Sequence, residues 1–420
     1  MHHRQVALNN RWVAGLLTVL ALLTLQQPAR ATADSTAHRA TIDIGTRPAQ
    51  LAADIGNTAL RETLGACTGP FRRSDFSIAH RGAPLEYPEH TRESYLAAAE
   101  QGAGIVECDV TFTRDKALVC RHSQCDLHTT TNILSTPLAS RCREPFQPAR
   151  LDDSGQLTPA SARCCTSDLS VAEFKSLRGR HDVVNASAGS VDEFLQDPPD
   201  RALSQGTLMT HRESIELFRS LGLKMTPELK APEVPMPFAG LTQEAYARAL
   251  IEEYLEAGVP PGRVFAQSFD LQDVLLWVRE YPAFADQAIY LDGRYDQREF
   301  KPGVAASWQP DMASLHASGV RIIAPPLWVL VALEGDSIQP SAYAIAAKQA
   351  GLELITWTLE RSGALHAGGG WYYQSIAPII DRDGDALELL HALASRVGVR
   401  GVFSDWPATV SFYANCMGLP

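Results

Sequence analysis

The chain contains 420 residues, of which 45% are hydrophobic and 20% are charged, and its formal net charge at pH 7 is −11. This composition is ordinary for a globular protein and excludes collagen-like, coiled-coil and wholly disordered chains. An acidic chain lacks the broad basic field that attracts polymeric nucleic acid, so we expect no nucleic-acid partner. Any phosphate that the protein binds should be met locally, by a metal ion or a few cations.

The N-terminus has the features of an export signal. Arg4 and Arg11 supply positive charge ahead of an almost continuous apolar run over residues 13–25. A small-x-small cleavage pattern follows and ends at Ala33. The run is roughly 13 residues long, which is short of the ~20 needed to span a bilayer. We therefore predict a signal peptide over residues 1–33 and a periplasmic or secreted protein without stable membrane insertion. An uncleaved anchor is the alternative.

The cysteines are even in number, which after export favours disulfide bonds. They lack the paired C-x-x-C knuckles of a zinc site, and eight cysteines allow about 105 pairings, so spacing alone does not fix the connectivity. Cys164 and Cys165 should bond to different partners, because a bridge between neighbours is strained. A bridge between Cys67 and Cys416 would tie the two ends of the domain together. The eight positions are 67, 108, 120, 125, 142, 164, 165 and 416.

Short β-branched runs alternate with amphipathic segments from about Ser77 onward. This alternation predicts an α/β protein with a parallel sheet, and eight strands are the number found in a closed (β/α)8 TIM barrel. An open, doubly wound sheet is the alternative, but the sequence contains no G-x-G-x-x-G turn. Helices are expected over residues 93–101, 171–177, 213–221, 245–257, 271–281, 342–350 and 386–397. The strands are expected over residues 77–80, 105–113, 223–228, 264–268, 288–291, 321–324, 353–358 and 401–404.

Two segments fall outside this alternation. Residues 34–74 are predicted to form an N-terminal extension that packs under the barrel. Residues 123–209 hold four of the eight cysteines and many Ser, Thr, Pro and Asp residues, which indicates an insertion stapled by disulfides. We therefore expect the barrel domain to comprise residues 75–420, with this cysteine-rich insertion after the second strand region.

Polar side chains follow the first two predicted strands. His80, Arg81 and Gly82 come where the first strand ends, and the C-terminal ends of barrel strands form the catalytic face. These residues are suited to binding an oxyanion or a phosphate. The alternative is that His80 is a loop histidine with an ordinary hydrogen bond. Glu107 and Asp109 are two residues apart on the second strand, so they face the same side. Converging carboxylates usually share a cation or a proton, and hard oxygen ligands favour Ca²⁺ or Mg²⁺.

Three further residues complete the set. Glu228 follows the third predicted strand and can complete a three-carboxylate site, while Lys230 would lie on the same side of an extended chain and hold a phosphate oxygen. His122 ends the segment ALVCRH. Two histidines on one face suit general acid and base roles, since an unperturbed pKa near ~6.5 leaves both protonation states accessible. Taken alone, Glu228 and Lys230 would be an ordinary surface pair.

The run HRG…PEHT…VECDV…TRD…LVCRH between residues 80 and 122 resembles the glycerophosphodiester phosphodiesterase family. The later segments TPELK at 226–230, QSFD at 267–270, TWT at 356–358 and GVFSDWP at 401–407 are similar to that family as well. The resemblance extends over about residues 76–409, interrupted by the insertion. It implies a TIM barrel that holds a divalent cation, Ca²⁺ or Mg²⁺. The implied activity is hydrolysis of small glycerophosphodiesters to sn-glycerol 3-phosphate and an alcohol.

The resemblance also implies roles for ten positions in one active site. The metal ligands would be Glu107, Asp109 and Glu228, and the acid and base would be His80 and His122. The phosphate would be contacted by Arg81 and Lys230. Supporting or lining residues would be Glu89, Phe269 and Trp357.

Two positions depart from the family pattern. His90 stands where the commoner form of the PEHT segment has Asn, and Ser123 stands where an Asp usually follows the second histidine. A carboxylate often sets the tautomer of an imidazole, so the second departure leaves open what orients His122. Asp126 lies three residues further on.

Two other functions are consistent with the sequence. A phospholipase D-like enzyme acting on lysophospholipids or sphingolipids would release a cyclic phosphate and favour a more apolar pocket mouth. A non-catalytic binding protein on the same scaffold would be expected to lack the histidines or carboxylates, all of which are present. The segment GGGWYY at residues 368–373 follows the seventh predicted strand. It could be an aromatic lid over the site or a structural loop. No protein partner is implied.

Overall fold

The computed structural model describes residues 42–196 and 205–420. The signal peptide predicted for residues 1–33 lies outside the described residues. Among the helices of the described part, none has the length and apolar character needed to cross a membrane.

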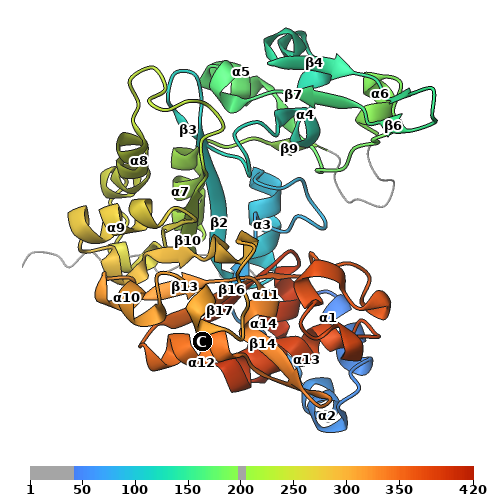
Figure 1. Ribbon diagram of the computed structural model, residues 1–420, viewed down its shortest axis with the longest axis vertical. Helices are drawn as coiled ribbons and strands as arrows, with labels where there is room; N and C mark the ends of the chain where they lie inside the picture. Colours follow the sequence, from blue (N-terminus) through green and yellow to red (C-terminus); the bar gives the residue numbers. More distant parts are fainter. Residues whose placement is uncertain (1–41, 197–204) are drawn as a thin grey trace, which may run out of the picture. The chain divides into compact units, whose positions relative to one another are not determined.

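A closed ring of parallel strands lies at the centre of the domain (Figure 1). The ring closes because β1 pairs in parallel with both β2 and β17, whereas an open sheet would leave two unpaired edges. A further strand, β3 (Leu118–Cys120), runs antiparallel to the last residues of β2. The predicted TIM barrel is therefore confirmed. In ring order its strands are β1 (Ser74–Ala79), β2 (Ala103–Phe112), β10 (Lys224–Leu229), β11 (Gln267–Ser268), β12 (Ile289–Leu291), β13 (Ile322–Ala324), β16 (Glu353–Leu359) and β17 (Gly401–Ser404).

Successive side chains on these strands face opposite sides of the ring. On β2, Ile105 belongs to an apolar cluster that collects residues from strands around the barrel. Val106 and Cys108 belong instead to the larger core between the strands and the helices. Glu107 and Asp109 therefore face the barrel interior together, as the alternation of the sequence predicts.

Helices cover the outside of the ring (Figure 1). Thr210 and Glu213 form the capping box of α7: the Thr210 side chain accepts a hydrogen bond from the Glu213 backbone, and Glu213 accepts one from the Thr210 backbone. The predicted helices around the barrel are found at or close to the predicted ranges. They are α3 (Arg92–Glu100), α7 (His211–Ser220), α8 (Gln243–Glu256), α9 (Leu271–Glu280), α12 (Ala342–Gln349) and α13 (Asp385–Ala392). Two further helices that cover the ring, α10 (Met312–Ala317) and α14 (Pro407–Cys416), were not predicted.

Two details of the ring differ from the prediction. β11 is shorter than the predicted range of 264–268, because Val264 makes only an isolated bridge to Met225 before the continuous pairing begins. Between β13 and α12 the chain adds α11 (Leu327–Leu330) and the hairpin of β14 (Val331–Glu334) and β15 (Ser337–Pro340).

The N-terminal segment packs on the outside of the barrel. Its helices α1 (Arg47–Ala53) and α2 (Thr58–Gly65) lie against α13 and α14. Asp54 accepts a hydrogen bond from the backbone of Gly384 at 3.0 Å, and Glu388 accepts one from the backbone of Asn57 at 2.8 Å. A disulfide joins Cys67 to Cys416, so the predicted bridge between the two ends is confirmed.

The segment between β3 and α7 has a small apolar core of its own, which includes Phe174 and Phe194. Disulfides join Cys125 to Cys165 and Cys142 to Cys164, so the two adjacent cysteines do bond to different partners. A fourth bridge, Cys108–Cys120, ties β2 to β3. The described elements of this segment are α4 (Leu127–Thr130), α5 (Val171–Ser176) and α6 (Val191–Phe194), with the strand pairs β4 (Glu144–Gln147) and β7 (Ser161–Arg163), β5 (Arg150–Leu151) and β6 (Leu157–Thr158), and β8 (Arg178–Gly179) and β9 (Gly206–Thr207).

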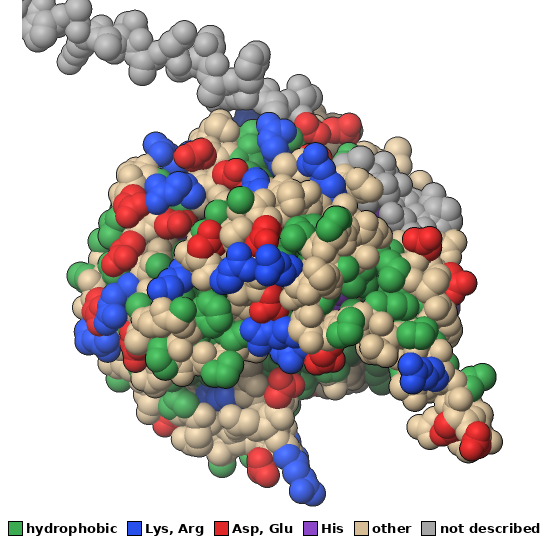
Figure 2. All heavy atoms as spheres, turned by 90° about the horizontal axis from the view of Figure 1, so that it is seen from above, with side chains coloured by type: hydrophobic (Ala, Val, Ile, Leu, Met, Phe, Trp, Pro, Cys, Tyr) green, Lys and Arg blue, Asp and Glu red, His purple; other side chains and the backbone are tan. Residues whose placement is uncertain are grey.

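Charges of both signs are interspersed on the face shown in Figure 2. Lys and Arg side chains alternate there with Asp and Glu side chains. This face therefore presents no broad basic field.

Candidate active site

A cavity of about 410 Å³ opens at the C-terminal ends of the barrel strands. Charged side chains and aromatic rings both line it. The lining includes eight of the ten residues predicted from the sequence: His80, Arg81, Glu107, His122, Glu228, Lys230, Phe269 and Trp357. The other two, Asp109 and Glu89, are buried in direct contact with these lining residues, as the following geometry shows.

Three buried carboxylates converge at the base of this cavity. Glu107 and Asp109 lie on β2, and Glu228 lies beside Asp109 in the register of β10 with β2. One oxygen atom from each of the three carboxylates lies within 4.8 Å of the others. Separate strands thus bring together residues that are up to 121 positions apart in the sequence, 107 to 228.

Each carboxylate is held by a neighbouring side chain or backbone group. Gln267 donates to Glu107 Oε1 at 2.8 Å, and the backbone N–H of Arg81 donates to Glu107 Oε2 at 3.0 Å. His90 Nε2 lies 2.9 Å from Asp109 Oδ2. His90, which replaces the commoner Asn of its motif, is thus an orienting partner of Asp109.

Electrostatic repulsion makes this carboxylate cluster a suitable site for a cation. Burial and the adjacent Asp109 raise the pKa of Glu107, and burial raises the pKa of Glu228 to about 7. Burial also opposes ionisation of Asp109, but Lys230 and His90 outweigh it and lower the pKa of that carboxyl. Asp109 Oδ1 is buried without a hydrogen-bond partner. An all-oxygen donor set with an unpartnered oxygen fits a hard divalent cation such as Ca²⁺ or Mg²⁺.

The imidazole of His80 is oriented by a second carboxylate. His80 Nδ1 lies 2.6 Å from Asp405 Oδ1, and Arg361 donates to the other oxygen of Asp405 at 2.8 Å. His80 Nε2 lies 3.9 Å from Glu107 Oε2. Burial lowers the pKa of His80 to about 4, against the opposing effect of Asp405. A neutral imidazole next to the cavity can accept a proton from a substrate or water oxygen.

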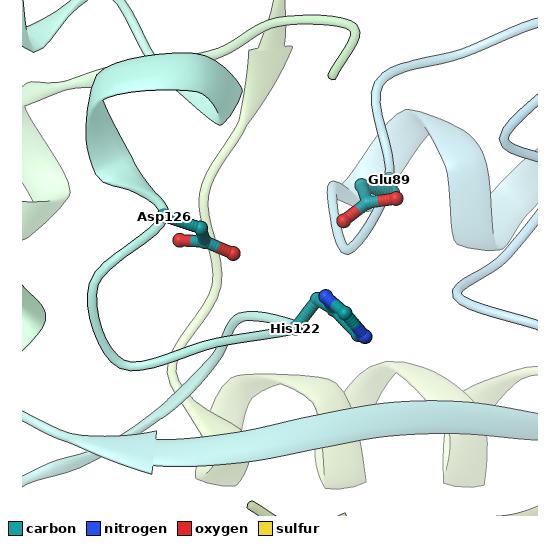
Figure 3. Close-up of side chains that lie close together, drawn as sticks. All are labelled: Glu89, His122 and Asp126. Atoms are coloured by element: carbon teal, nitrogen blue, oxygen red, sulfur yellow. The ribbon is translucent and has the colours of Figure 1, made fainter. Parts of the chain in front are cut away.

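His122 lines the same cavity and lies in the loop that follows β3. Burial and the nearby cations Arg81 and Lys230 lower its pKa well below the usual value. Figure 3 shows the His122 ring together with the carboxylates of Glu89 and Asp126. One ligand atom from each of these three residues lies within 4.8 Å of the other two.

Cationic groups line the same cavity. Arg81 adopts a positive φ of 61°, and it donates to Glu89 Oε2 at 3.0 Å. Arg361 lies 3.6 Å from the same Glu89 oxygen. Lys230 Nζ lies 2.5 Å from Glu228 Oε1. These cations balance the buried carboxylates and supply positive charge to an anionic substrate.

Aromatic rings form one wall of the cavity. Trp357 and Trp371 are stacked with ring centroids 6.1 Å apart, and Tyr295 meets both of them edge-on. Phe269 contacts Trp357 edge-on at 6.0 Å. Trp371 belongs to the GGGWYY segment, so this segment does contact the aromatic wall, and 44% of the Trp371 surface remains exposed.

The sequence reasoning missed several residues that complete the site. Asp405 lies in the quoted segment GVFSDWP, directly after β17, and its place at a strand end was the available signal. Gln267 lies in the quoted segment QSFD. Arg361 lies in the loop after β16 and Tyr295 in a short 3-10 helix after β12, both without a recognisable sequence pattern, so only the fold reveals their contact with the cavity.

Comparisons with known proteins agree with this geometry. The sequence model of the glycerophosphoryl diester phosphodiesterase family matches residues 80–409. An "Extracellular protein" of Arthroderma benhamiae is 47% identical over 248 residues, which cover 57% of this chain and 100% of that protein. "Probable glycerophosphodiester phosphodiesterase 1" of Mycobacterium tuberculosis is 45% identical over 71 residues, which cover 16% of this chain and 26% of that protein.

A crystal structure from Silicibacter pomeroyi that carries the same family's name shares the fold. It superimposes with a TM-score of 0.54 at 19% sequence identity, covering 85% of this chain and 97% of that one. Because the family match spans most of the chain and includes the barrel and its cavity, the protein belongs to the glycerophosphoryl diester phosphodiesterase family.

Proposed function

We propose that the protein hydrolyses glycerophosphodiesters to sn-glycerol 3-phosphate and an alcohol in a metal-dependent reaction. The observation that carries this proposal is the convergence of three carboxylates, two imidazoles and two cations on one cavity. A phosphodiester is a monoanion whose phosphoryl oxygens gain charge as the reaction proceeds. The cavity offers positive charge and proton-transfer groups at the same place.

Glu107, Asp109 and Glu228 would hold one divalent cation, Ca²⁺ or Mg²⁺. Such a cation, when bound, supplies a Lewis acid that neutralises charge on phosphoryl oxygens. Arg81 and Lys230 would contact the phosphate and add to this neutralisation. Glu89 would hold the Arg81 guanidinium in place through the hydrogen bond described above.

The two histidines would move protons on opposite sides of the phosphate. One would remove the proton of the attacking hydroxyl as its oxygen bonds to phosphorus. The other would protonate the leaving alkoxide as the phosphorus–oxygen bond to the alcohol breaks. The attacking group is water or the glycerol 2-hydroxyl, and the latter gives a cyclic phosphate first. Asp405 would keep His80 in one orientation and tautomer.

We further propose that the enzyme works outside the cytoplasm, with the barrel domain at residues 75–420, an N-terminal extension at 34–74 and an insertion at 123–209. Four disulfides support this location, since such bonds persist in oxidising compartments. The name of the Arthroderma relative, an extracellular protein, supports it as well. A cleaved signal peptide at residues 1–33 would direct the export.

The aromatic wall favours a second candidate, a phospholipase D-like activity on lysophospholipids or sphingolipids. Phe269 lines the cavity, and Trp371 stacks on the cavity residue Trp357; both rings are partly exposed and offer apolar surface to an acyl chain. The two candidates differ in their products, because the phospholipase D-like reaction ends at a cyclic phosphate.

Phosphorus NMR on purified protein separates these candidates. The expected result is metal-dependent release of glycerol 3-phosphate from glycerophosphocholine, lost in chelator and restored by Mg²⁺ or Ca²⁺. His80→Ala is expected to abolish turnover while leaving the circular dichroism spectrum unchanged. Full activity in chelator would refute the metal role, and a lysophospholipid turned over to a cyclic phosphate alone would favour the second candidate.

A further inference from the structure

A second polar cluster lies beside the catalytic cavity, and the proposed reaction leaves most of it unexplained. Glu89 comes from the loop after β1, His122 from the loop after β3, and Asp126 from the start of the insertion (Figure 3). In Figure 3 the two carboxylates face the His122 ring from different directions. One ligand atom of each residue lies within 4.8 Å of the others.

Each carboxylate keeps one buried oxygen without a hydrogen-bond partner. Glu89 Oε2 is occupied by Arg81, but Glu89 Oε1 has no partner. Asp126 Oδ2 accepts from the backbone N–H of Ser123 at 3.1 Å, but Asp126 Oδ1 has no partner. Glu89 is 3% exposed and Asp126 is 9% exposed. A buried acceptor without a donor is costly, so these oxygens call for a donor within the cluster.

The insertion holds Asp126 firmly in this place. Asp126 is the N-cap residue of α4, yet its side chain makes no capping bond to that helix and accepts instead from the Ser123 backbone. Its backbone forms a parallel bridge with Cys164, and the next residue, Leu127, donates to the Cys164 carbonyl at 3.2 Å. The preceding residue, Cys125, is bonded to Cys165. Two disulfides that share these adjacent cysteines thus fix the segment that carries Asp126.

We infer that Asp126, with Glu89, is the positioning carboxylate of His122. The imidazole N–H donates a hydrogen bond to a carboxylate oxygen, directly or through one water molecule. This bond turns the other ring nitrogen toward the substrate. Ser123 occupies the position directly after the histidine, where a hydroxyl replaces the expected carboxylate. The insertion would restore that carboxylate three residues later. This inference rests on the proposed function for its assignment of His122 as acid or base.

The surrounding charges favour a hydrogen-bonded imidazole over a second metal ion. Arg81 and Arg361 both lie against Glu89, and Arg121 donates to its backbone carbonyl. A divalent cation at the cluster would be repelled by these guanidinium groups.

The first test compares Asp126→Asn with Asp153→Asn, an exposed aspartate of the same insertion. Asp126→Asn keeps an acceptor for the Ser123 backbone and removes a buried carboxylate. We expect kcat on glycerophosphocholine to fall about 10- to 100-fold with KM changed less than threefold, and the pH profile of kcat to shift. Asp153→Asn should behave as the wild type. An unchanged pH profile and kcat in Asp126→Asn would overturn the inference.

The second test reads the tautomer of His122 without an activity assay. In ¹⁵N-histidine NMR, with the signal assigned by its loss in His122→Gln, the wild-type ring should populate one tautomer and Asp126→Asn a mixture. This measurement does not depend on turnover of a glycerophosphodiester. A failure of the proposed function can therefore be distinguished from a failure of the positioning role. A wild-type ring that already exchanges between tautomers would refute the positioning role, whether or not the variant folds. Two metal ions per wild-type chain but one in Asp126→Asn would instead identify Asp126 as a ligand and overturn the inference.

Discussion

Asp405 accepts a 2.6 Å hydrogen bond from the Nδ1 of His80, although 325 positions separate the two residues in the sequence. The last barrel strand places Asp405 beside the first, because β17 and β1 are neighbours in the closed ring. This pairing fixes which nitrogen of His80 faces the cavity.

Asp405→Asn should therefore lower kcat on glycerophosphodiesters by about 10²- to 10⁴-fold, the range expected when an amide favours the wrong imidazole tautomer. Steady-state kinetics at saturating metal would measure the loss. The matched control is Asp273→Asn, since Asp273 is also a buried aspartate but does not line the cavity. Comparable kcat values in the two variants would show that His80 does not depend on Asp405.

Metal binding should stabilise the protein independently of any assay of activity. A ligand bound only by the folded state adds about 2.7 kcal/mol at a concentration 100-fold above its Kd. We expect Mg²⁺ or Ca²⁺ to raise the Tm of the chelator-treated wild type, and Glu107→Gln to abolish most of this rise. The apo form of Glu107→Gln should be no less stable than the wild type, because burial and Asp109 already disfavour the charged form of Glu107.

Differential scanning calorimetry would measure both effects. Glu144→Gln, which removes an exposed carboxylate in the insertion, is the matched control and should keep the full metal-induced rise in Tm. A full rise in Glu107→Gln would place the metal elsewhere.

The sequence predicts the strands and names charged residues that the barrel brings to one cavity, but it does not predict the contacts that depend on ring closure. The β-branched runs and the spacing of Glu107 and Asp109 are local patterns, and period-two alternation puts both side chains inside the barrel. Asp405, in contrast, has no local feature that links it to His80. The sequence also leaves open what orients His122: it places Asp126 four residues away, but only the fold shows that a ligand atom of each lies within 4.8 Å of the other.

The disulfide network shows the same limit. Eight cysteines allow about 105 pairings, and the sequence restricted them only through the adjacency of Cys164 and Cys165 and the expected bridge between Cys67 and Cys416. The bridge between Cys108 and Cys120 follows from the antiparallel pairing of β2 and β3, in which Val110 faces Cys120. That pairing extends beyond the barrel and was not part of the predicted alternation.

The bridge between Cys67 and Cys416 should contribute mainly to stability. It spans a sequence separation of 349 residues, so it restricts the unfolded chain strongly. The double variant Cys67→Ser, Cys416→Ser should lose about 2–5 kcal/mol of unfolding free energy while keeping kcat at 25 °C, because neither residue lines the cavity. Urea titration and kinetics on the same samples would test this. A loss of kcat at unchanged stability would contradict the structural role.

Asp273 should make the protein less stable as the pH rises from about 4 to above 6. Burial raises the pKa of Asp273 to about 6, although Gln243 and Ser268 donate hydrogen bonds to its carboxylate. The folded state therefore binds more protons than the unfolded state between pH 4 and pH 6, and the free energy of unfolding falls with pH across this interval. Urea titrations of the wild type and Asp273→Asn at pH 4.5 and 7.5 would isolate this contribution. The free energy of unfolding of the wild type, relative to that of the variant, should be higher at pH 4.5 than at pH 7.5 by on the order of 1–2 kcal/mol. A pH-independent difference would show that Asp273 ionises normally.

Trp371 should affect substrate binding more than catalysis or folding. It stacks on Trp357 and contacts Tyr295, and none of its aromatic neighbours is a proposed metal ligand or histidine. Because 44% of its surface is exposed, Trp371→Ala should cost little stability and raise KM for glycerophosphocholine about 3- to 10-fold with kcat nearly unchanged. Cation–π contact with the choline group would contribute roughly 0.5–2 kcal/mol, and the expected change in KM, equivalent to about 0.7–1.4 kcal/mol, falls within this range. Glycerophosphoglycerol, whose alcohol carries no cation, serves as the control substrate and should show a smaller change in KM. An equal change for both substrates would indicate that Trp371 shapes the cavity mouth without recognising the cationic group.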